Sequence, residues 1–178
     1  MPSFVIHIAV AQEYQRNYPE EIKRQEDFWK GIIAPDLGKN REERDQLHYV
    51  KNSDNVLYQK FFKEHEIIND YEIGYLLHLI TDEAFYCYWF EKELQKVNEN
   101  QDDFYHDYDC INQELLSKYK IPLLPEIKDY VKQINEEPRY LELEKVLCFI
   151  QRISNISLQE QMKQIKEKEK IIEGREGM

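Results

Sequence analysis

Glycine, proline and cysteine are all scarce in this chain, and it has no long apolar run. Only 5 Gly and 6 Pro occur among 178 residues, which disfavours a fold of many short strands and turns and favours long helices. The three cysteines, Cys87, Cys110 and Cys148, are odd in number and lack CxxC spacing, which argues against a disulfide framework and for a reducing compartment. No stretch approaches the roughly 18 apolar residues of a membrane span, and the first seven residues lack the basic region of a signal peptide. We therefore expect a cytoplasmic protein without a transmembrane segment.

Acidic residues outnumber basic ones, 35 against 24, for a formal charge of −11. Such a surface repels polyanions at long range, so neither nucleic acid nor an anionic membrane is the expected partner. A bound cation would still reverse the sign of charge locally, so a phosphate-bearing substrate is compatible with this composition. Nothing in the composition indicates an oligomeric state.

Apolar residues recur at helical spacing along most of the chain, which predicts an all-α fold. The strongest pattern covers residues 71–97 and is typical of a long, buried central helix. Residues 34–52 lack this periodicity and are expected to form a long irregular segment. A compact multi-helix domain should cover residues 1–155, with a charged C-terminal helix over 156–178 packed on it or extending from it. The remaining helices are expected at 4–17, 19–34, 53–62, 104–119, 126–134, 140–153 and 157–172.

His78 and Asp82 lie four residues apart in the central helix, so both side chains can reach one cation. Spacing of this kind more often reflects a hydrogen-bonded pair than a set of metal ligands. The apolar and aromatic residues on either side predict burial, however, and a buried carboxylate without a partner is costly. Asp82 should therefore have a cation or a hydrogen-bond donor nearby.

Three further candidate ligands lie in other segments. His7 interrupts an apolar helix, where a hydrogen-bonded core histidine is the simpler interpretation. Asp36 follows a proline at the start of the irregular segment, where turn aspartates are common. His48 lies within that segment. Imidazoles and carboxylates are the ligands that zinc favours, so convergence of these side chains would create a zinc-type site between helices.

The last two histidines differ in their surroundings. His106 has Asp109 and Cys110 three and four residues further on, on the same helical face. His65 lies in a charged run and is expected to be exposed to solvent.

Taken in order, these residues resemble the zinc-dependent phospholipase C and single-strand nuclease superfamily, most closely its short intracellular bacterial branch. The match is carried by residues 1–7, 31–36, 48–49 and 70–82, with weaker similarity at 108–112 and 118–119. It extends over most of residues 1–155. The order His, Asp, His and HxxxD is fairly specific in combination, although each piece alone is not.

The resemblance implies that helices present ligands to a zinc cluster, here of one or two ions. Asp36, His48, His78 and Asp82 resemble the ligands of one ion. Asp82 would bridge to a neighbouring ion, for which His7 resembles a ligand.

A further zinc site of the family is degenerate in this sequence. The family takes a histidine six residues beyond the bridging aspartate, where Tyr88 stands here. His106 resembles the other histidine of that site. With Asp109 and Cys110 it would form either a weak second metal site or only the rim of a pocket.

The function implied by the resemblance is zinc-dependent hydrolysis of a small or lipid-like phosphoester, in which a metal-bound water would be the catalytic group. Two alternatives stay open. The first is a non-catalytic binding protein that keeps the fold and a metal, and the second is a helical interaction module whose histidines are core residues. Metal content separates the last alternative from the other two, and turnover of phosphoesters separates those two from each other.

Overall fold

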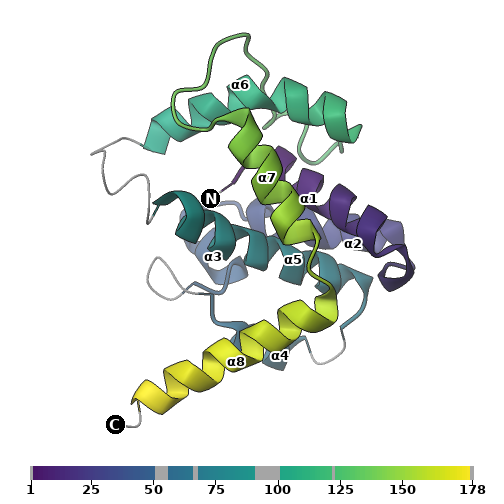
Figure 1. Ribbon diagram of the computed structural model, residues 1–178, viewed down its shortest axis with the longest axis vertical. Helices are drawn as coiled ribbons and strands as arrows, with labels where there is room; N and C mark the ends of the chain where they lie inside the picture. The colour runs from purple at the N-terminus through teal and green to yellow at the C-terminus, as the bar shows by residue number, and fades with distance from the viewer. Residues whose placement is uncertain (1, 51–55, 66–67, 91–100, 122, 177–178) are drawn as a thin grey trace.

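Helix α5 (Asp70–Phe85) lies at the centre of the structure, a computed structural model that describes residues 2–50, 56–65, 68–90, 101–121 and 123–176 (Figure 1). A capping box begins the helix, since the Asn69 side chain accepts from the Tyr71 amide and Glu72 accepts from the Asn69 amide. The expected buried central helix is therefore confirmed, but its regular part is shorter than predicted. A π-helical turn (Tyr86–Phe90) follows it, and residues 91–97 of the predicted helix lie outside the described residues.

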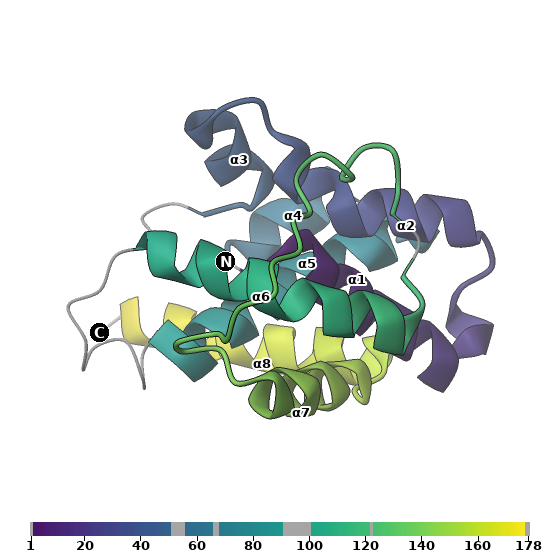
Figure 2. The same cartoon turned by 90° about the horizontal axis from the view of Figure 1, so that it is seen from above.

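The other helices pack around α5. Helix α6 lies across one end of the molecule and α8 across the other, with α7 running between them, while α1 lies beside α5 and α2 lies behind α1 (Figures 1 and 2). Within the described ranges there is no β-strand, only one isolated bridge between Val50 and Val56, so the predicted all-α class is confirmed. The further α-helices are α1 (Phe4–Asn17), α2 (Gln25–Ile33), α3 (Arg41–Leu47), α4 (Tyr58–Glu64), α6 (Gln101–Tyr119), α7 (Leu143–Ser154) and α8 (Leu158–Glu176).

Helices α2 and α5 make the most extensive helix–helix contact in the described fold. Two glycines allow this close crossing. A Cβ added at Gly31 would lie 2.0 Å from the backbone oxygen of Tyr71, and one added at Gly74 would lie 2.2 Å from that of Phe28. Both distances are far below van der Waals contact, so the backbones could not approach this closely with any larger residue.

Helix α1 is buried on every side in its first two turns. Residues 5–11 are all buried, which is typical of a helix that passes through the core of a domain. Ser3 caps the helix by accepting from the Ile6 amide. This position carries His7, with a side chain only 1% exposed, into the interior.

The segment predicted to be irregular, residues 34–52, contains regular structure, so that prediction is wrong. A 3₁₀ turn (Ala34–Leu37) follows α2, and α3 occupies Arg41–Leu47. Asn40 caps α3 by accepting from the Glu43 amide, and Glu43 accepts in return from the Lys39 amide. None of the residues of α3 is buried, so the helix lacks the apolar face on which the prediction depended.

Two other predicted helices differ from the structure. Residues 19–34 divide into a 3₁₀ turn (Pro19–Glu21) and α2. Residues 126–130 form turns and residues 131–134 have no regular structure, so the prediction of a helix at 126–134 is wrong. The backbone of the second part bonds to α6 instead, since the Asn112 side chain donates to the Lys132 carbonyl and the Ile134 amide to the Asp109 carbonyl. The start of the helix predicted at 53 lies outside the described residues.

Helix α8 packs against the domain through its first half. Ile165 is buried in a cluster with Leu76 and Leu79 of α5, and Lys168 forms an ion pair with Glu83. None of the described helices is long and apolar enough to cross a membrane.

Candidate metal centre

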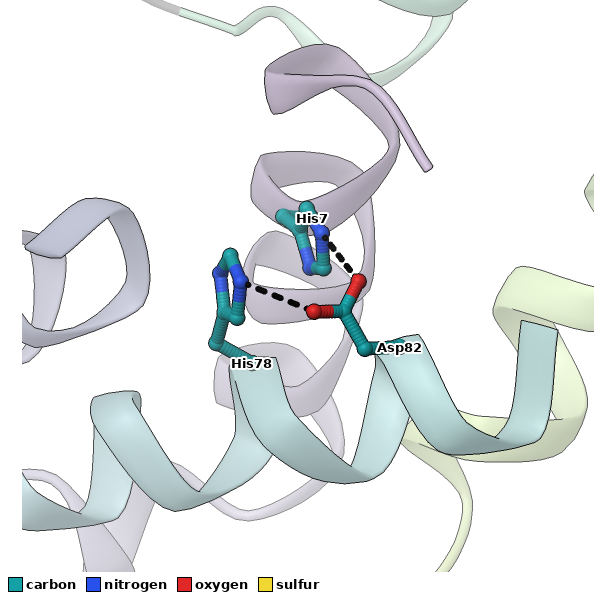
Figure 3. Close-up of side chains that lie close together, drawn as sticks. All are labelled: His7, His78 and Asp82. Atoms are coloured by element: carbon teal, nitrogen blue, oxygen red, sulfur yellow. Dashed lines mark ion pairs between the residues drawn. The ribbon is translucent and has the colours of Figure 1, made fainter. Parts of the chain in front are cut away.

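Five ligand-type side chains converge where α1, α3 and α5 meet the 3₁₀ turn after α2. Figure 3 shows three of them, with His7 of α1 above the His78 and Asp82 pair of α5. One donor atom each from His7, His78 and Asp82 lies within 4.8 Å of the others, and the same holds for Asp36, His48 and His78. His78 belongs to both groups. The structure thus brings together all five of the residues predicted to form the main metal site.

Asp82 lies between the two groups. Its Oδ1 is 3.3 Å from Nε2 of His7, while its Oδ2 is 3.1 Å from Nε2 of His48 and 3.4 Å from Nε2 of His78. Asp36 approaches the same His48 nitrogen at 3.3 Å. The two oxygens of Asp82 therefore face different histidines, an arrangement that suits either one ion or two neighbouring ions.

Backbone carbonyls orient two of the imidazoles. Nδ1 of His48 is 2.7 Å from the Arg44 carbonyl, and Nδ1 of His78 is 2.8 Å from the Ile32 carbonyl. A carbonyl oxygen can only accept, so each Nδ1 carries the proton and each neutral ring presents the lone pair of Nε2 to the cluster. The two Nε2 atoms lie 3.1 Å apart. Two lone pairs at that distance require a proton or a metal cation between them.

Several buried polar atoms at this point have no hydrogen bond within the described residues. They are both carboxylate oxygens of Asp82 and both ring nitrogens of His7. Their approaches to neighbours at 3.1–3.4 Å lack hydrogen-bond geometry. Buried polar groups are almost always satisfied, and leaving one unpaired is costly. A cation among these atoms would satisfy them together, so the buried His and Asp groups could hold a metal ion.

The pKa shifts of the cluster follow from its burial and charge. Burial and the neighbouring His78 lower the pKa of His7, which favours its neutral form. Burial also acts to lower the pKa of His48, but Asp36 and Asp82 outweigh it and raise that pKa to about 10. Burial raises the pKa of Asp82, yet the surrounding histidines hold it well below its usual range. The cluster without metal therefore contains ionised Asp82 and protonated His48 at neutral pH.

Access to the centre is restricted. The side chains of His7, His48 and His78 are at most 3% exposed, whereas those of Asp36 and Asp82 are 12% and 10% exposed. Because both carboxylate oxygens of Asp82 are themselves buried, a ligand from solvent would first meet Asp36.

The residues that hold His48 in place were not predicted from the sequence. Tyr75, one turn before His78 on α5, donates its hydroxyl hydrogen to the Leu47 carbonyl beside His48. Tyr49, the residue after His48, has a φ of 55° and takes the left-handed position that ends a helix, with its hydroxyl bonded to Glu64. His65, predicted to be exposed, is instead partly buried beside the Tyr49 hydroxyl at 3.2 Å. Aromatic residues next to a candidate ligand were the only signal in the sequence.

The second candidate group, around His106, differs from the predicted set of His106, Asp109 and Cys110. His106, Asp107 and Cys110 have donor atoms within 4.8 Å of one another, and Asp109 is not among them. Asp107 is already occupied, since its carboxylate accepts from the backbone amides of residues 139, 140 and 141 at 2.6–2.9 Å. His106 pairs with Glu136 at 2.9 Å. These contacts join α6 to the chain before α7, and the second metal site stays a prediction.

We expect Asp107→Ala to destabilise the fold by about 3 kcal/mol, because three backbone amides would lose a charged acceptor and each such loss is worth roughly 1–3 kcal/mol. Only the bond from the Leu141 amide is fully buried, and the other two are partly buried. The midpoint and slope of urea unfolding would measure the change. Asp109→Ala, two residues along the same helix, is the matched control and should shift stability by no more than about 0.5 kcal/mol. Equal effects of the two substitutions would contradict the anchoring role of Asp107.

Comparison with protein-family models, with curated proteins and with solved structures found no match to this chain. Its class is thus defined by the fold and the site alone: an all-α protein with a buried cluster of histidines and aspartates that could hold a metal ion.

Proposed function

We propose that this chain is a metal-dependent phosphoester hydrolase whose centre binds one or two zinc ions through His7, Asp36, His48, His78 and Asp82. Three imidazoles and two carboxylates are the ligand types that zinc favours. The proposal rests above all on one observation: the two Nε2 atoms of His48 and His78 face each other at 3.1 Å beside Asp82 oxygens that have no hydrogen bond. In the metal-free cluster the proton on His48 separates these two nitrogens, and a bound cation would replace that proton and satisfy the Asp82 oxygens as well.

The protein side of the chemistry follows from the geometry. The Arg44 carbonyl holds the tautomer of His48 and the Ile32 carbonyl that of His78. Asp36 is the most exposed of the five side chains, at 12%. When bound, zinc would lower the pKa of a water molecule and polarise phosphate oxygens. Two carboxylates would then balance the charge of the cation, and the buried surroundings would strengthen its pull on an anionic phosphate.

The resemblance to the zinc-dependent phospholipase C and single-strand nuclease superfamily supports hydrolysis as the reaction. The charge of −11 favours a small or lipid-like phosphoester over long nucleic acid, because an acidic surface repels an extended polyanion outside the site. The odd cysteine count supports action inside the cell.

The test is metal content followed by turnover. Protein purified without a metal-binding tag should contain zinc by elemental analysis, and it should hydrolyse bis-p-nitrophenyl phosphate or a short-chain phosphatidylcholine until a chelator is added. Restoring zinc should restore the rate. Zinc-loaded protein that turns over no phosphoester in a broad panel would reject the hydrolase. Cleavage that survives chelation would show that this centre is not the catalyst.

The low exposure of the histidines favours a second candidate function, a structural or ligand-capturing zinc centre. Structural zinc sites are closed by protein ligands, whereas catalytic sites keep a position open. On this alternative, zinc should raise the melting temperature strongly and no phosphoester should be cleaved. Exchange of the metal for cobalt would distinguish the two, because added phosphate should change the visible spectrum only where a coordination position is open.

We expect zinc binding to release a proton from His48. The pKa of this group in the metal-free protein is about 10, so it is protonated at neutral pH and must lose that proton to bind a metal. Affinity should therefore rise with pH, by up to about tenfold per pH unit until pH approaches that pKa. Titration calorimetry in buffers of different ionisation enthalpy would count the protons. A pH-independent affinity between pH 7 and 9 would contradict this assignment.

A further inference from the structure

A pocket of about 540 Å³ lies between α5, α7 and α8. None of the five metal-centre residues lines it. On α5 it is bounded by Ile80 and Ala84, which point to the opposite side of the helix from His78 and Asp82 because successive residues turn by about 100°. The pocket is therefore a separate site on the far side of the central helix.

The walls of the pocket are mostly apolar. Ile80 and Ala84 line it from α5, Phe149 and Ile153 from α7, and Ile165 from α8. Its volume lies within the roughly 300–1,000 Å³ typical of small-molecule sites. Apolar walls open to water favour an apolar ligand body, since burial of such surface is the main driving force for binding.

Three charged residues contribute to the lining, and two of them neutralise each other. Glu83 forms an ion pair with Lys168 and also accepts from the Tyr58 hydroxyl. Gln161, a polar residue of the lining, donates its amide to the carbonyls of Ile153 and Ile156. The guanidinium of Arg152 is exposed and has no ion pair or hydrogen bond with any described part of the chain. Among the described residues that line this pocket, the uncommitted charge is thus a single cation, Arg152.

We propose that this pocket binds a small amphiphile with one anionic head, a carboxylate or a phosphate monoester, and an apolar chain. The chain would lie against the isoleucines and Phe149, and the head would pair with Arg152. The planar guanidinium has the fork geometry that carboxylate and phosphate oxygens match. The protein carries a charge of −11, so non-specific electrostatic attraction favours cations and disfavours anions. Tighter binding of an anion than of a neutral probe would therefore indicate a specific contact with Arg152.

Three ten-carbon probes test the proposal: decanoate, decyl phosphate and decanol, each below its micelle concentration. Calorimetry on the full chain should show at least one of the two anions binding about tenfold more tightly than decanol. The tighter of the two identifies the head group. Isoleucine methyl NMR signals should shift for Ile80, Ile153 and Ile165. Decanol binding as tightly as both anions, or no probe binding at all, would overturn the proposal.

Three variants locate the binding. Arg152→Gln should bring the anions close to the decanol affinity, and Ala84→Phe should fill the pocket and remove binding of every probe. Lys163→Gln, which removes a charge from α8 outside the lining, should change nothing. Because carboxylates and phosphates also bind zinc, the probes are measured again in His78→Ala, where binding should persist. Anion binding that survives Arg152→Gln and Ala84→Phe, or that disappears in His78→Ala, would place the anion site elsewhere.

Discussion

His78→Ala is expected to remove zinc from the protein, because His78 belongs to both groups of converging ligands. Changing only an outer partner of a metal ligand lowers affinity by about 10–100-fold, so loss of a shared ligand should lower it by more than about a hundredfold. Any phosphoesterase activity should disappear with the metal. The helical circular dichroism should stay largely intact. The variant also removes one of the two imidazole nitrogens that face each other at 3.1 Å, so the other is no longer held against a second lone pair.

The measurement is zinc stoichiometry by elemental analysis and affinity by competition with a chelator. His106→Ala is the matched control, since it also removes one imidazole and its partner is Glu136 instead of the central cluster. That variant should keep the zinc content of the unmodified protein if the His106 group binds no metal, whereas a lower content would support a second site. His78→Ala with unchanged zinc content would contradict the proposed centre.

Gly74→Ala is expected to destabilise the fold and to weaken metal binding in one step. The added methyl group would lie 2.2 Å from the Phe28 backbone oxygen, so α2 and α5 would have to separate. Overpacking of this kind costs typically 1–3 kcal/mol and sometimes more, while alanine in place of glycine gains only about 1 kcal/mol of helix propensity. With a backbone oxygen in the way, we expect the upper end of that cost and therefore a net loss of about 2 kcal/mol.

The same separation should move the Ile32 carbonyl away from His78, whose Nδ1 is 2.8 Å from it. Zinc affinity should then fall by roughly 10–100-fold, the usual effect of losing an outer partner of a ligand. Thermal unfolding without zinc and chelator competition with zinc would measure the two effects separately. Gly31→Ala should have the same effects, because its added Cβ would lie 2.0 Å from the Tyr71 backbone oxygen at the same helix crossing. Gly174→Ala in α8 serves as the control. Unchanged stability in both crossing variants would show that the helices have room to adjust.

The central cluster is a case in which metal affinity and fold stability depend on the same contacts. Helix α5 contributes His78 and Asp82 to the centre, Gly74 to the crossing with α2, and Tyr75 to the end of α3. Substitutions at Gly74 or Tyr75 would therefore change metal binding without touching a ligand. Comparing zinc affinity with the stability of the metal-free protein separates the two contributions.

Local interactions were sufficient to predict the all-α class and the helices that bury an apolar face. The α5 prediction depended on apolar periodicity, and the Asn69 cap with which the helix begins likewise acts within a few residues. The four-residue spacing of His78 and Asp82 placed them on one helical face for the same reason. Helix α3 was missed because it is held by caps and exposes all its side chains to some degree. Residues 126–134 were mistaken for a helix because their hydrogen-bond partners lie on α6, far away in the sequence.

Only the tertiary structure decided which of the candidate residues meet. The sequence offered five histidines and several carboxylates, and it could not show that His48 turns into the cluster. It also could not show that His65, expected to be exposed, is partly buried beside Glu72 and Tyr49. The carbonyls of Ile32 and Arg44, which orient two imidazoles, belong to every residue type and leave no trace in a sequence. The pocket beside Arg152 also arises from three helices whose residues are distant along the chain. Periodicity and capping are short-range and can be recognised locally, whereas convergence depends on how closely the helices pack, and here two glycines set that distance.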